Sequence, residues 1–151
     1  MDEDEIRSLL KHEKRFKGVF AIDEIAAVIL DKDTGIIVNT SERSKAYGHW
    51  LLLYKTAQST FIYIDSLNLN LFLYNNNYLK MFFKKNNVNS IKSLCYPIQP
   101  LYSKTCALYV IYFLCHLLSH VDLTVIISHF DCKNLFNNDA LVSNYILKKL
   151  K

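Results

Sequence analysis

Residues 99–118 read QPLYSKTCALYVIYFLCHLL, and this stretch decides the fold. A polar segment that contains a proline ends at Cys106, and a mostly apolar run follows it as far as Leu118. Because the run is apolar on nearly every helical face, it predicts a helix at the centre of the domain. A cysteine on the first turn of a helix has its thiolate stabilised by free N–H groups and by the helix dipole. Cys106 is therefore the first candidate nucleophile.

A nucleophilic cysteine also needs a base and a group that orients the base. His49 opens a strand-like run over residues 49–54, and Asp65 lies near the end of a second such run. Residues 55–60 between the runs are typical of a hairpin loop, and a hairpin can bring His49 and Asp65 together. The sequence thus predicts a base and its orienting carboxylate on one sheet, facing the helix of Cys106.

The other segments alternate between helical and extended patterns. A turn at residues 31–35 and a polar loop at residues 41–47 flank the first predicted strand, and a further loop covers residues 84–89. The predicted helices and strands are these: helices over residues 3–13, 69–83, 106–118 and 134–151, a helical turn within 16–30, strands over 36–40, 49–54, 61–66 and 90–98, and a strand or short helix over 121–130.

The composition indicates one domain over residues 1–151. Hydrophobic residues make up 51% of the chain, and only three glycines and two prolines are present, which argues against disorder and long linkers. Four cysteines without a pairing pattern, together with the acidic start Met1-Asp2-Glu3-Asp4-Glu5, indicate a reducing, intracellular compartment and no secretion. The longest apolar run, residues 106–115, is shorter than the roughly 18 residues that a membrane span needs, so we expect no membrane association.

Charge leaves a nucleic-acid partner open. The net charge of +4 is below the strong basicity of a dedicated nucleic-acid-binding domain. Clustered Lys and Arg side chains could nevertheless form a phosphate-binding face; the clusters are Lys11, Lys14, Arg15 and Lys17, then Lys84 and Lys85, then Lys148, Lys149 and Lys151. The simpler interpretation, which we favour, is that they are solvated helix ends.

The candidate residues, in their order along the chain, resemble a known group of enzymes. The order is that of the Ulp1-like clan of cysteine proteases: His49, Trp50, Asp65, Gln99 and Cys106. The similarity is closer to the adenovirus-type (adenain-like) maturation proteases, which adenoviruses, related DNA viruses and virus-like transposons encode. Gln99 precedes Cys106 by seven positions, as in those enzymes, and residues 14–20 and 37–40 are similar to their N-terminal segment. The resemblance covers roughly residues 14–120.

Three positions depart from the pattern of that family. Ala107 replaces the glycine that usually follows the nucleophile, and Asp65 is the choice of the wider clan where adenovirus enzymes mostly have Glu. Asn68 replaces a glycine after the Asp65 turn, and asparagine is the residue that best tolerates a left-handed backbone after glycine. None of these changes removes a reacting group, so we expect an active enzyme.

The resemblance implies an α+β fold, with a mixed β-sheet packed against a central apolar helix that carries the nucleophilic cysteine at its N-terminus. It implies a single cysteine endopeptidase domain that cleaves viral capsid or core precursor proteins at Gly-containing sites during virion maturation. Its location would be the virion and the infected host cell, and we expect a monomer. The chemistry requires no cofactor, although DNA and an activating peptide are cofactors that the resemblance suggests.

The resemblance also implies residue roles. His49 would take the proton of Cys106 and Asp65 would hold the imidazole, while the Gln99 amide and the Cys106 N–H would bind the oxyanion. Trp50 would form a rigid wall against the substrate beside the scissile bond, the alternative being a core aromatic residue on a strand.

Two other functions remain open: deconjugation of a ubiquitin-like modifier, and a non-catalytic DNA- or capsid-binding protein on this scaffold. For the remaining cysteines and histidines we expect no metal site. Cys95 and Cys115 are predicted to be buried core residues. The group of His129, Asp131 and Cys132 lacks a second ligand pair. His116 and His120, four positions apart, would share a helix face without a further ligand.

Overall fold

The fold is built on one mixed β-sheet. The computed structural model describes residues 1–56, 60–69 and 76–151. Five strands lie side by side in the order β1-β2-β3-β4-β5; they are Phe16–Ala21 (β1), Thr34–Asn39 (β2), Trp50–Lys55 (β3), Thr60–Ile64 (β4) and Ser90–Ser93 (β5). The outer pairs β1–β2 and β4–β5 are parallel, and the inner pairs β2–β3 and β3–β4 are antiparallel. The expectation of an α+β fold with a mixed sheet is confirmed.

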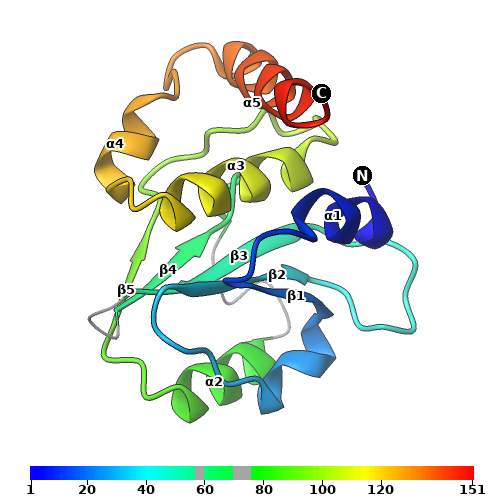
Figure 1. Ribbon diagram of the computed structural model, residues 1–151, viewed down its shortest axis with the longest axis vertical. Coiled ribbons are helices and arrows are strands. Elements are labelled where there is room, and N and C mark those ends of the chain that lie inside the picture. Colours follow the sequence, from blue (N-terminus) through cyan, green and yellow to red (C-terminus); the bar gives the residue numbers. More distant parts are fainter. Residues whose placement is uncertain (57–59, 70–75) are drawn as a thin grey trace.

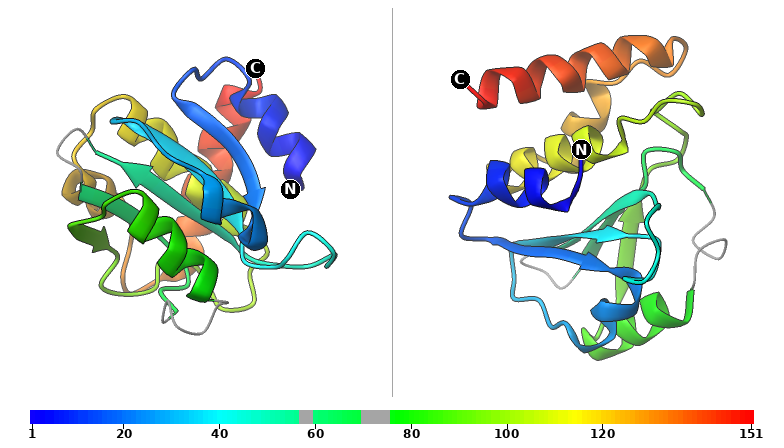
Figure 2. Two further views of the ribbon diagram at one scale, coloured as in Figure 1. Left: turned by 90° about the horizontal axis from the view of Figure 1, so that it is seen from below. Right: turned by 90° about the vertical axis from the view of Figure 1, so that its right-hand side faces the viewer.

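Helices cover both faces of this sheet. They are Glu3–Leu10 (α1), a 3₁₀ helix at Ile22–Ala27 (η1), Asn76–Lys85 (α2), Cys106–Leu118 (α3), Leu123–Ser128 (α4) and Leu135–Lys149 (α5). Figure 1 shows α1 and α3 above the sheet and α2 below it, with α5 stacked on the outer side of α3. The two further views in Figure 2 show the same layers, with η1 beside α2. No helix among the described residues is long and apolar enough to cross a membrane.

Alternation along the central strands divides the core into two. Leu52 and Tyr54 of β3 belong to the hydrophobic cluster that contains α1, α3, α4 and α5. Leu51 and Leu53, the intervening residues, belong to the cluster formed with η1 and α2 on the opposite face. Because successive side chains of a strand point to opposite faces, a strand with helices on both sides must be apolar throughout. This explains the uninterrupted run of apolar residues in β3.

Helix α3 is buried along almost its whole length. Ten of its 13 residues are buried, and it packs on β3 and β2 on one side and on α5 on the other. Gly35 of β2 permits this close approach, since a Cβ atom there would lie 3.0 Å from both Leu114 Cδ1 and Tyr54 Cδ2. A helix that is apolar on nearly every face is thus covered on nearly every face.

Most predicted elements are present with small changes of boundary. The strands predicted over residues 36–40, 49–54 and 61–66 correspond to β2, β3 and β4, and the terminal helix predicted over 134–151 corresponds to α5. The segment 121–130 forms the short helix α4 rather than a strand. Helix α1 ends at Leu10, three residues before its predicted end.

Strand β1 is absent from the prediction, which placed only a helical turn within residues 16–30. The turn is present as η1, but Phe16–Ala21 pair with β2 as a parallel edge strand. The pairing register shifts between Phe16 and Val19, and Gly18 between them has a φ of 128°. Such an irregularity breaks the two-residue alternation by which a strand is recognised.

The strand predicted over residues 90–98 is also wrong in its length. Strand β5 ends at Ser93 and all four of its residues are exposed, so it is a short edge strand with little apolar burial. Cys95 follows it and is exposed, which corrects the prediction of a buried core cysteine, whereas Cys115 is buried as predicted. Pro97, which lacks an N–H donor, is unsuited to extend the strand toward Gln99.

Two predicted segments fall partly on residues outside the described part of the chain. In the hairpin loop at 55–60, residues 57–59 are not described, and the flanking Thr56 N–H donates to the Thr60 carbonyl at 2.9 Å. In the helix predicted over 69–83, residues 70–75 are not described. The described helix α2 begins at Asn76 and ends at Lys85, two residues beyond the predicted end.

The contact of Gly35 with α3 can be tested by Gly35→Ala. The added methyl group must displace Leu114 or Tyr54, so we expect unfolding to become easier by about 1–3 kcal/mol, the usual cost of overpacking. The measurement is urea denaturation, with Asn144→Ala on the exposed face of α5 as a control that should change stability by less than about 0.5 kcal/mol. An unchanged midpoint for Gly35→Ala would show that α3 does not press on β2 there.

Candidate active site

The two polar residues at the adjoining ends of β3 and β4 meet. His49 directly precedes β3 and Asp65 directly follows β4, and the antiparallel register pairs Leu52 with Ile64. The His49 Nε2 and the Asp65 Oδ1 are 2.7 Å apart. The side chains are 15% and 1% exposed, respectively, so the pair is largely shielded from water. The strand pairing therefore brings these two residues together, as the sequence predicts.

The turn after β4 holds the Asp65 carboxylate in place. Its Oδ1 also accepts a hydrogen bond from the Leu67 N–H at 3.0 Å, and its Oδ2 accepts one from the Leu69 N–H at 3.1 Å. Asn68 between them has a φ of 49°, so the expectation that Asn68 takes a left-handed backbone is confirmed. The turn thus supplies two backbone donors to a buried carboxylate, which keeps its rotamer fixed.

The backbone of His49 is tied to the end of β2. The His49 N–H donates to Thr40 Oγ1 at 2.9 Å, and the Thr40 N–H donates to the His49 carbonyl at 2.9 Å. At the preceding residue, Gly48, a Cβ atom would lie 1.8 Å from Asn39 Oδ1. A side chain at this position would therefore displace that of Asn39, whose Oδ1 accepts a hydrogen bond from the Ser41 N–H at 2.9 Å.

Cys106 lies on the first turn of α3 and faces His49. The thiol lies beside the His49 side chain and near the backbone N–H groups of Trp50 and Ala107, and these neighbours lower its pKa. The imidazole is therefore in contact with Asp65 on one side and Cys106 on the other. Helix α3, β3 and the end of β4 each contribute one of the three side chains.

The pKa values of this pair shift in opposite directions. Burial alone would lower the pKa of His49, but its hydrogen bonds to Asp65 and Cys106 and their charges raise it to about 9. Burial alone would raise the pKa of the Cys106 thiol, but the hydrogen bond from His49 and the neighbouring N–H groups lower it. The arrangement thus favours a thiolate beside an imidazolium over a broad range of pH.

Gln99 is buried under the loop that leads to Cys106, with 2% of its surface exposed. Its Oε1 accepts a hydrogen bond from Ser66 Oγ at 2.5 Å, and its Nε2 donates to the Ser103 carbonyl at 2.8 Å. Gln99 and Cys106 thus belong to one short polar loop that enters α3. Sequence reasoning missed Ser66, although it directly follows Asp65.

Asp139 of α5 is a second residue that sequence reasoning missed. Its Oδ1 accepts hydrogen bonds from Thr105 Oγ1 and from the Tyr109 hydroxyl, both at 2.8 Å. Thr105 Oγ1 also bonds with Ser103 Oγ. The loop before Cys106 is therefore anchored to α5, and no local sequence signal pairs residues this far apart.

Trp50 lies in the core and adjoins the site through its backbone. The residue is 8% exposed and belongs to the same hydrophobic cluster as α3. It also lines a surface pocket of about 340 Å³ together with Gly48, Tyr47 and the start of α1. The mainly buried indole fits the core interpretation, and its exposed edge at the pocket is the part that a substrate could contact.

The remaining histidines and cysteines lie outside the contacts of His49 with Asp65 and Cys106. Among the described residues, no three His, Cys, Asp or Glu side chains gather as a metal site would require. His120 lies beyond the end of α3 with a φ of 60°, so the prediction that it shares a helix face with His116 is wrong. His129 Nδ1 is 2.8 Å from the Tyr112 hydroxyl, which places it in an aromatic cluster on α3, α4 and α5.

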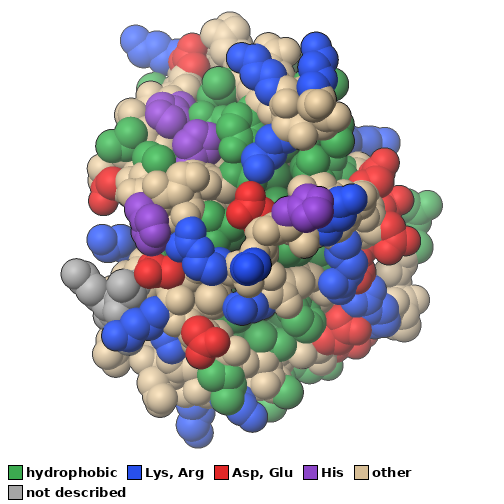
Figure 3. Space-filling model, in the orientation of Figure 1, with side chains coloured by type: hydrophobic (Ala, Val, Ile, Leu, Met, Phe, Trp, Pro, Cys, Tyr) green, Lys and Arg blue, Asp and Glu red, His purple; other side chains and the backbone are tan. Residues whose placement is uncertain are grey.

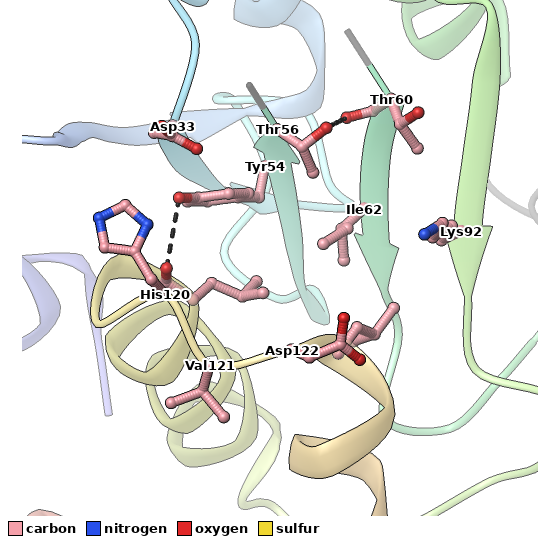
Figure 4. A pocket seen from close by; sticks show the side chains of 11 residues that line it. Asp33, Tyr54, Thr56, Thr60, Ile62, Lys92, His120, Val121 and Asp122 are labelled. Carbon is pink, nitrogen blue, oxygen red and sulfur yellow. Dashed lines mark hydrogen bonds between the residues drawn. The ribbon is translucent and has the colours of Figure 1, made fainter. Parts of the chain in front are cut away.

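A separate cavity of about 250 Å³ lies at the opposite end of α3 from Cys106. Figure 4 shows Asp33, Tyr54 and His120 at this cavity, and the Tyr54 hydroxyl donates to the Leu117 carbonyl at 3.4 Å. Because α3 has 13 residues, its ends are separated by about 20 Å. This cavity is therefore distinct from the candidate active site.

No protein-family model matches the chain, and no curated protein matches it.

The ionised state of Cys106 can be measured through its alkylation by iodoacetamide. A thiol with the ordinary pKa of about 8.5 is only about 0.3% thiolate at pH 6. Because the pKa of Cys106 is lowered and that of His49 is raised to about 9, we expect alkylation of Cys106 to persist well below pH 8. Mass spectrometry resolves each site, so the exposed Cys95 and Cys132 serve as references within the same sample.

Asp65→Asn should shift that alkylation profile to higher pH. The substitution removes the carboxylate charge that stabilises the imidazolium, and the weakened imidazolium in turn stabilises the thiolate less. A profile of the wild-type Cys106 centred near 8.5 would show that no thiolate–imidazolium pair exists.

Proposed function

We propose that this chain is a cysteine endopeptidase in which Cys106 is the nucleophile, His49 the general base and acid, and Asp65 the residue that orients His49. The observation that carries the proposal is the succession of contacts from the buried Asp65 through His49 to the partly buried Cys106. A nucleophile, a base and an orienting carboxylate on three separate elements are the parts that covalent acyl transfer needs. In this proposal, α3 is the central apolar helix that carries the nucleophile at its N-terminus.

The proposed reaction proceeds through a thioester. The Cys106 thiolate attacks a peptide carbonyl, and the His49 imidazolium gives its proton to the departing amine. His49 then takes a proton from water, and the resulting hydroxide equivalent hydrolyses the thioester and releases the thiol. Asp65 keeps the imidazole in the orientation that both proton transfers require, and it stabilises its positive charge.

The oxyanion of the tetrahedral intermediate would be bound by the Cys106 N–H and the Gln99 amide. Gln99 lies in the loop that precedes Cys106, and its Nε2 is on the side of the Ser103 carbonyl. Free N–H groups on the first turn of α3 add to this positive potential. Removal of one such donor typically costs about 10²–10³ in rate.

The ordered residues His49, Trp50, Asp65, Gln99 and Cys106 support the narrower proposal of an adenovirus-type maturation protease. Its substrates would be viral capsid or core precursor proteins, and its setting the virion and the infected cell. The proposal draws on the resemblance of these motifs together with their proximity, because acyl-transfer geometry alone does not select a substrate.

DNA as a cofactor receives little support from the distribution of charge. Figure 3 shows Lys and Arg side chains interspersed with acidic and apolar ones over the face seen there. Two of the clustered cations are bound within the fold, since Arg15 donates to the Leu118 carbonyl and Lys149 is 3.5 Å from Glu13. These contacts make Arg15 and Lys149 less available to phosphate groups.

Substitution of the nucleophile tests the proposal directly. Cys106→Ala should abolish peptide cleavage and leave the fold intact, because alanine has a high helix propensity. The matched control is Cys95→Ala, which removes an exposed thiol outside the site and should retain wild-type turnover. Gln99→Ala should lose less than Cys106→Ala, about 10²–10³ in kcat. Wild-type turnover by Cys106→Ala would refute the mechanism.

The preference for glycine can be tested with peptide libraries. If the exposed edge of Trp50 restricts the space beside the scissile bond, glycine is the residue that fits where the backbone must approach closely. We expect cleavage after glycine within sites that carry a small or aliphatic residue two positions before it. Replacement of that glycine by valine in the substrate should remove most of the rate. A branched or aromatic preference immediately before the cut would assign Trp50 to the core alone.

A further inference from the structure

Ser66 connects the end of β4 to the loop of the nucleophile. The residue is 0% exposed and makes three hydrogen bonds with the segment at Gln99. Its carbonyl accepts from the Ile98 N–H at 2.9 Å and from the Gln99 N–H at 3.1 Å. Its hydroxyl donates to Gln99 Oε1 at 2.5 Å. Both the backbone and the side chain of Gln99 are therefore held by this one serine.

These contacts fix which end of the Gln99 amide faces which neighbour. The Ser103 carbonyl can only accept a hydrogen bond, so the Nε2 end of the amide must face it, at 2.8 Å. The Ser66 hydroxyl satisfies the opposite end by donating its single hydrogen to Oε1. A reversed amide would place its oxygen against the Ser103 carbonyl oxygen. The amide orientation is thus determined from both ends.

One donor of this amide remains available. Nε2 carries two hydrogens, and one is given to the Ser103 carbonyl. Within residues 1–56, 60–69 and 76–151, the second hydrogen has no hydrogen-bond partner. A buried amide that is fixed at both ends and keeps one free N–H is suited to meet a charge that develops only during reaction.

We propose that Ser66 is a positioning residue that directs the free N–H of Gln99 toward the oxyanion. The inference rests on the proposed cysteine-endopeptidase function and adds a residue to its machinery. Asp65 and Ser66 are consecutive, and they divide two tasks: Asp65 orients the base through His49, and Ser66 orients the oxyanion donor through Gln99. One turn of backbone at the end of β4 thereby sets both geometries.

Two thiol probes separate these tasks. Iodoacetamide alkylates the thiolate by displacement of iodide and forms no oxyanion, so its rate reports the Cys106–His49 pair alone. A peptide aldehyde ending in glycinal adds the thiol across its carbonyl, and the new oxygen occupies the place of the oxyanion. Its inhibition constant can be measured without turnover, from the protection of Cys106 against iodoacetamide. The aldehyde therefore reports the oxyanion donors as well.

Ser66→Ala should weaken aldehyde binding by at least about tenfold, a part of the 10²–10³ that loss of a whole oxyanion donor costs. The iodoacetamide profile of Cys106 against pH should stay as in the wild type, and kcat for a glycine-containing peptide should fall with little change in KM. Ser66→Thr keeps the hydroxyl donor and should restore aldehyde binding. A serine with a purely structural role would change the alkylation profile as well.

A second comparison holds even if Ser66→Ala alone does not fold, because that variant leaves the buried Oε1 without a donor. In a Gln99→Ala background this oxygen is absent. Addition of Ser66→Ala to that background should then change aldehyde binding by less than about twofold, since contacts that act as a unit are not additive. A further tenfold loss in the double variant, or wild-type aldehyde binding by Ser66→Ala, would overturn the role of Ser66. Failure of the wild-type protein to bind the aldehyde would instead contradict the proposed function itself.

Discussion

The burial of α3 is the constraint on which the rest of the structure depends. This helix is apolar on nearly all sides, so it must be covered by the sheet below and by α5 above. Because Gly35 has no side chain, Leu114 of α3 packs directly against β2, and this contact fixes the distance between the helix and the sheet. Because a close-packed core permits little sliding, the N-terminal turn of α3 has one position relative to the ends of β3 and β4. Cys106 owes its place beside His49 to this packing.

The end of β4 serves as the fixed point for the polar groups. The Asp65 carboxylate accepts two hydrogen bonds from backbone N–H groups of the following turn. The Ser66 carbonyl accepts two more from backbone N–H groups of the segment that leads to Cys106. Buried polar groups are costly unless they are hydrogen-bonded, and here the hydrogen bonds of Ser66 also join the end of β4 to the segment before α3. The same contacts that satisfy buried atoms therefore hold Asp65 within its turn and hold the Gln99 segment against the end of β4.

The sequence predicts the site better than it predicts the edges of the fold. His49 and Asp65 bracket two apolar runs whose pairing is local, so a hairpin brings them together without knowledge of the rest of the chain. The edge strands β1 and β5 lack regular alternation, because Gly18 interrupts one and the other is exposed on all four residues. The wrong prediction for Cys95 has the same origin. Its expected burial depended on a strand that continued past it, whereas β5 ends at Ser93.

Other parts of the site could not be predicted because their contacts are distant in the chain. The Ser66–Gln99 and Thr105–Asp139 contacts span 33 and 34 positions. Serine, threonine and aspartate are common in loops, where they usually bond locally or to solvent. Only the packing of α5 on α3 places Asp139 within reach of Thr105. Such pairs become visible once the three-dimensional fold is known.

The placement of Thr105 bears on the lowered pKa of the partly buried Cys106 thiol. A threonine in the N-cap position usually accepts a hydrogen bond from an N–H group of the first helical turn. In α3 the Thr105 side chain makes no such bond, and its hydroxyl is instead directed to Asp139. The Ala107 N–H, which such a cap could otherwise occupy, lies near the Cys106 sulfur and helps to lower the pKa of the thiol. Burial raises the pKa of the thiol, and the N–H groups that a capping side chain would otherwise occupy help to lower it. Because the Thr105 hydroxyl donates to Asp139 instead, the packing of α5 reaches the environment of Cys106 through this loop.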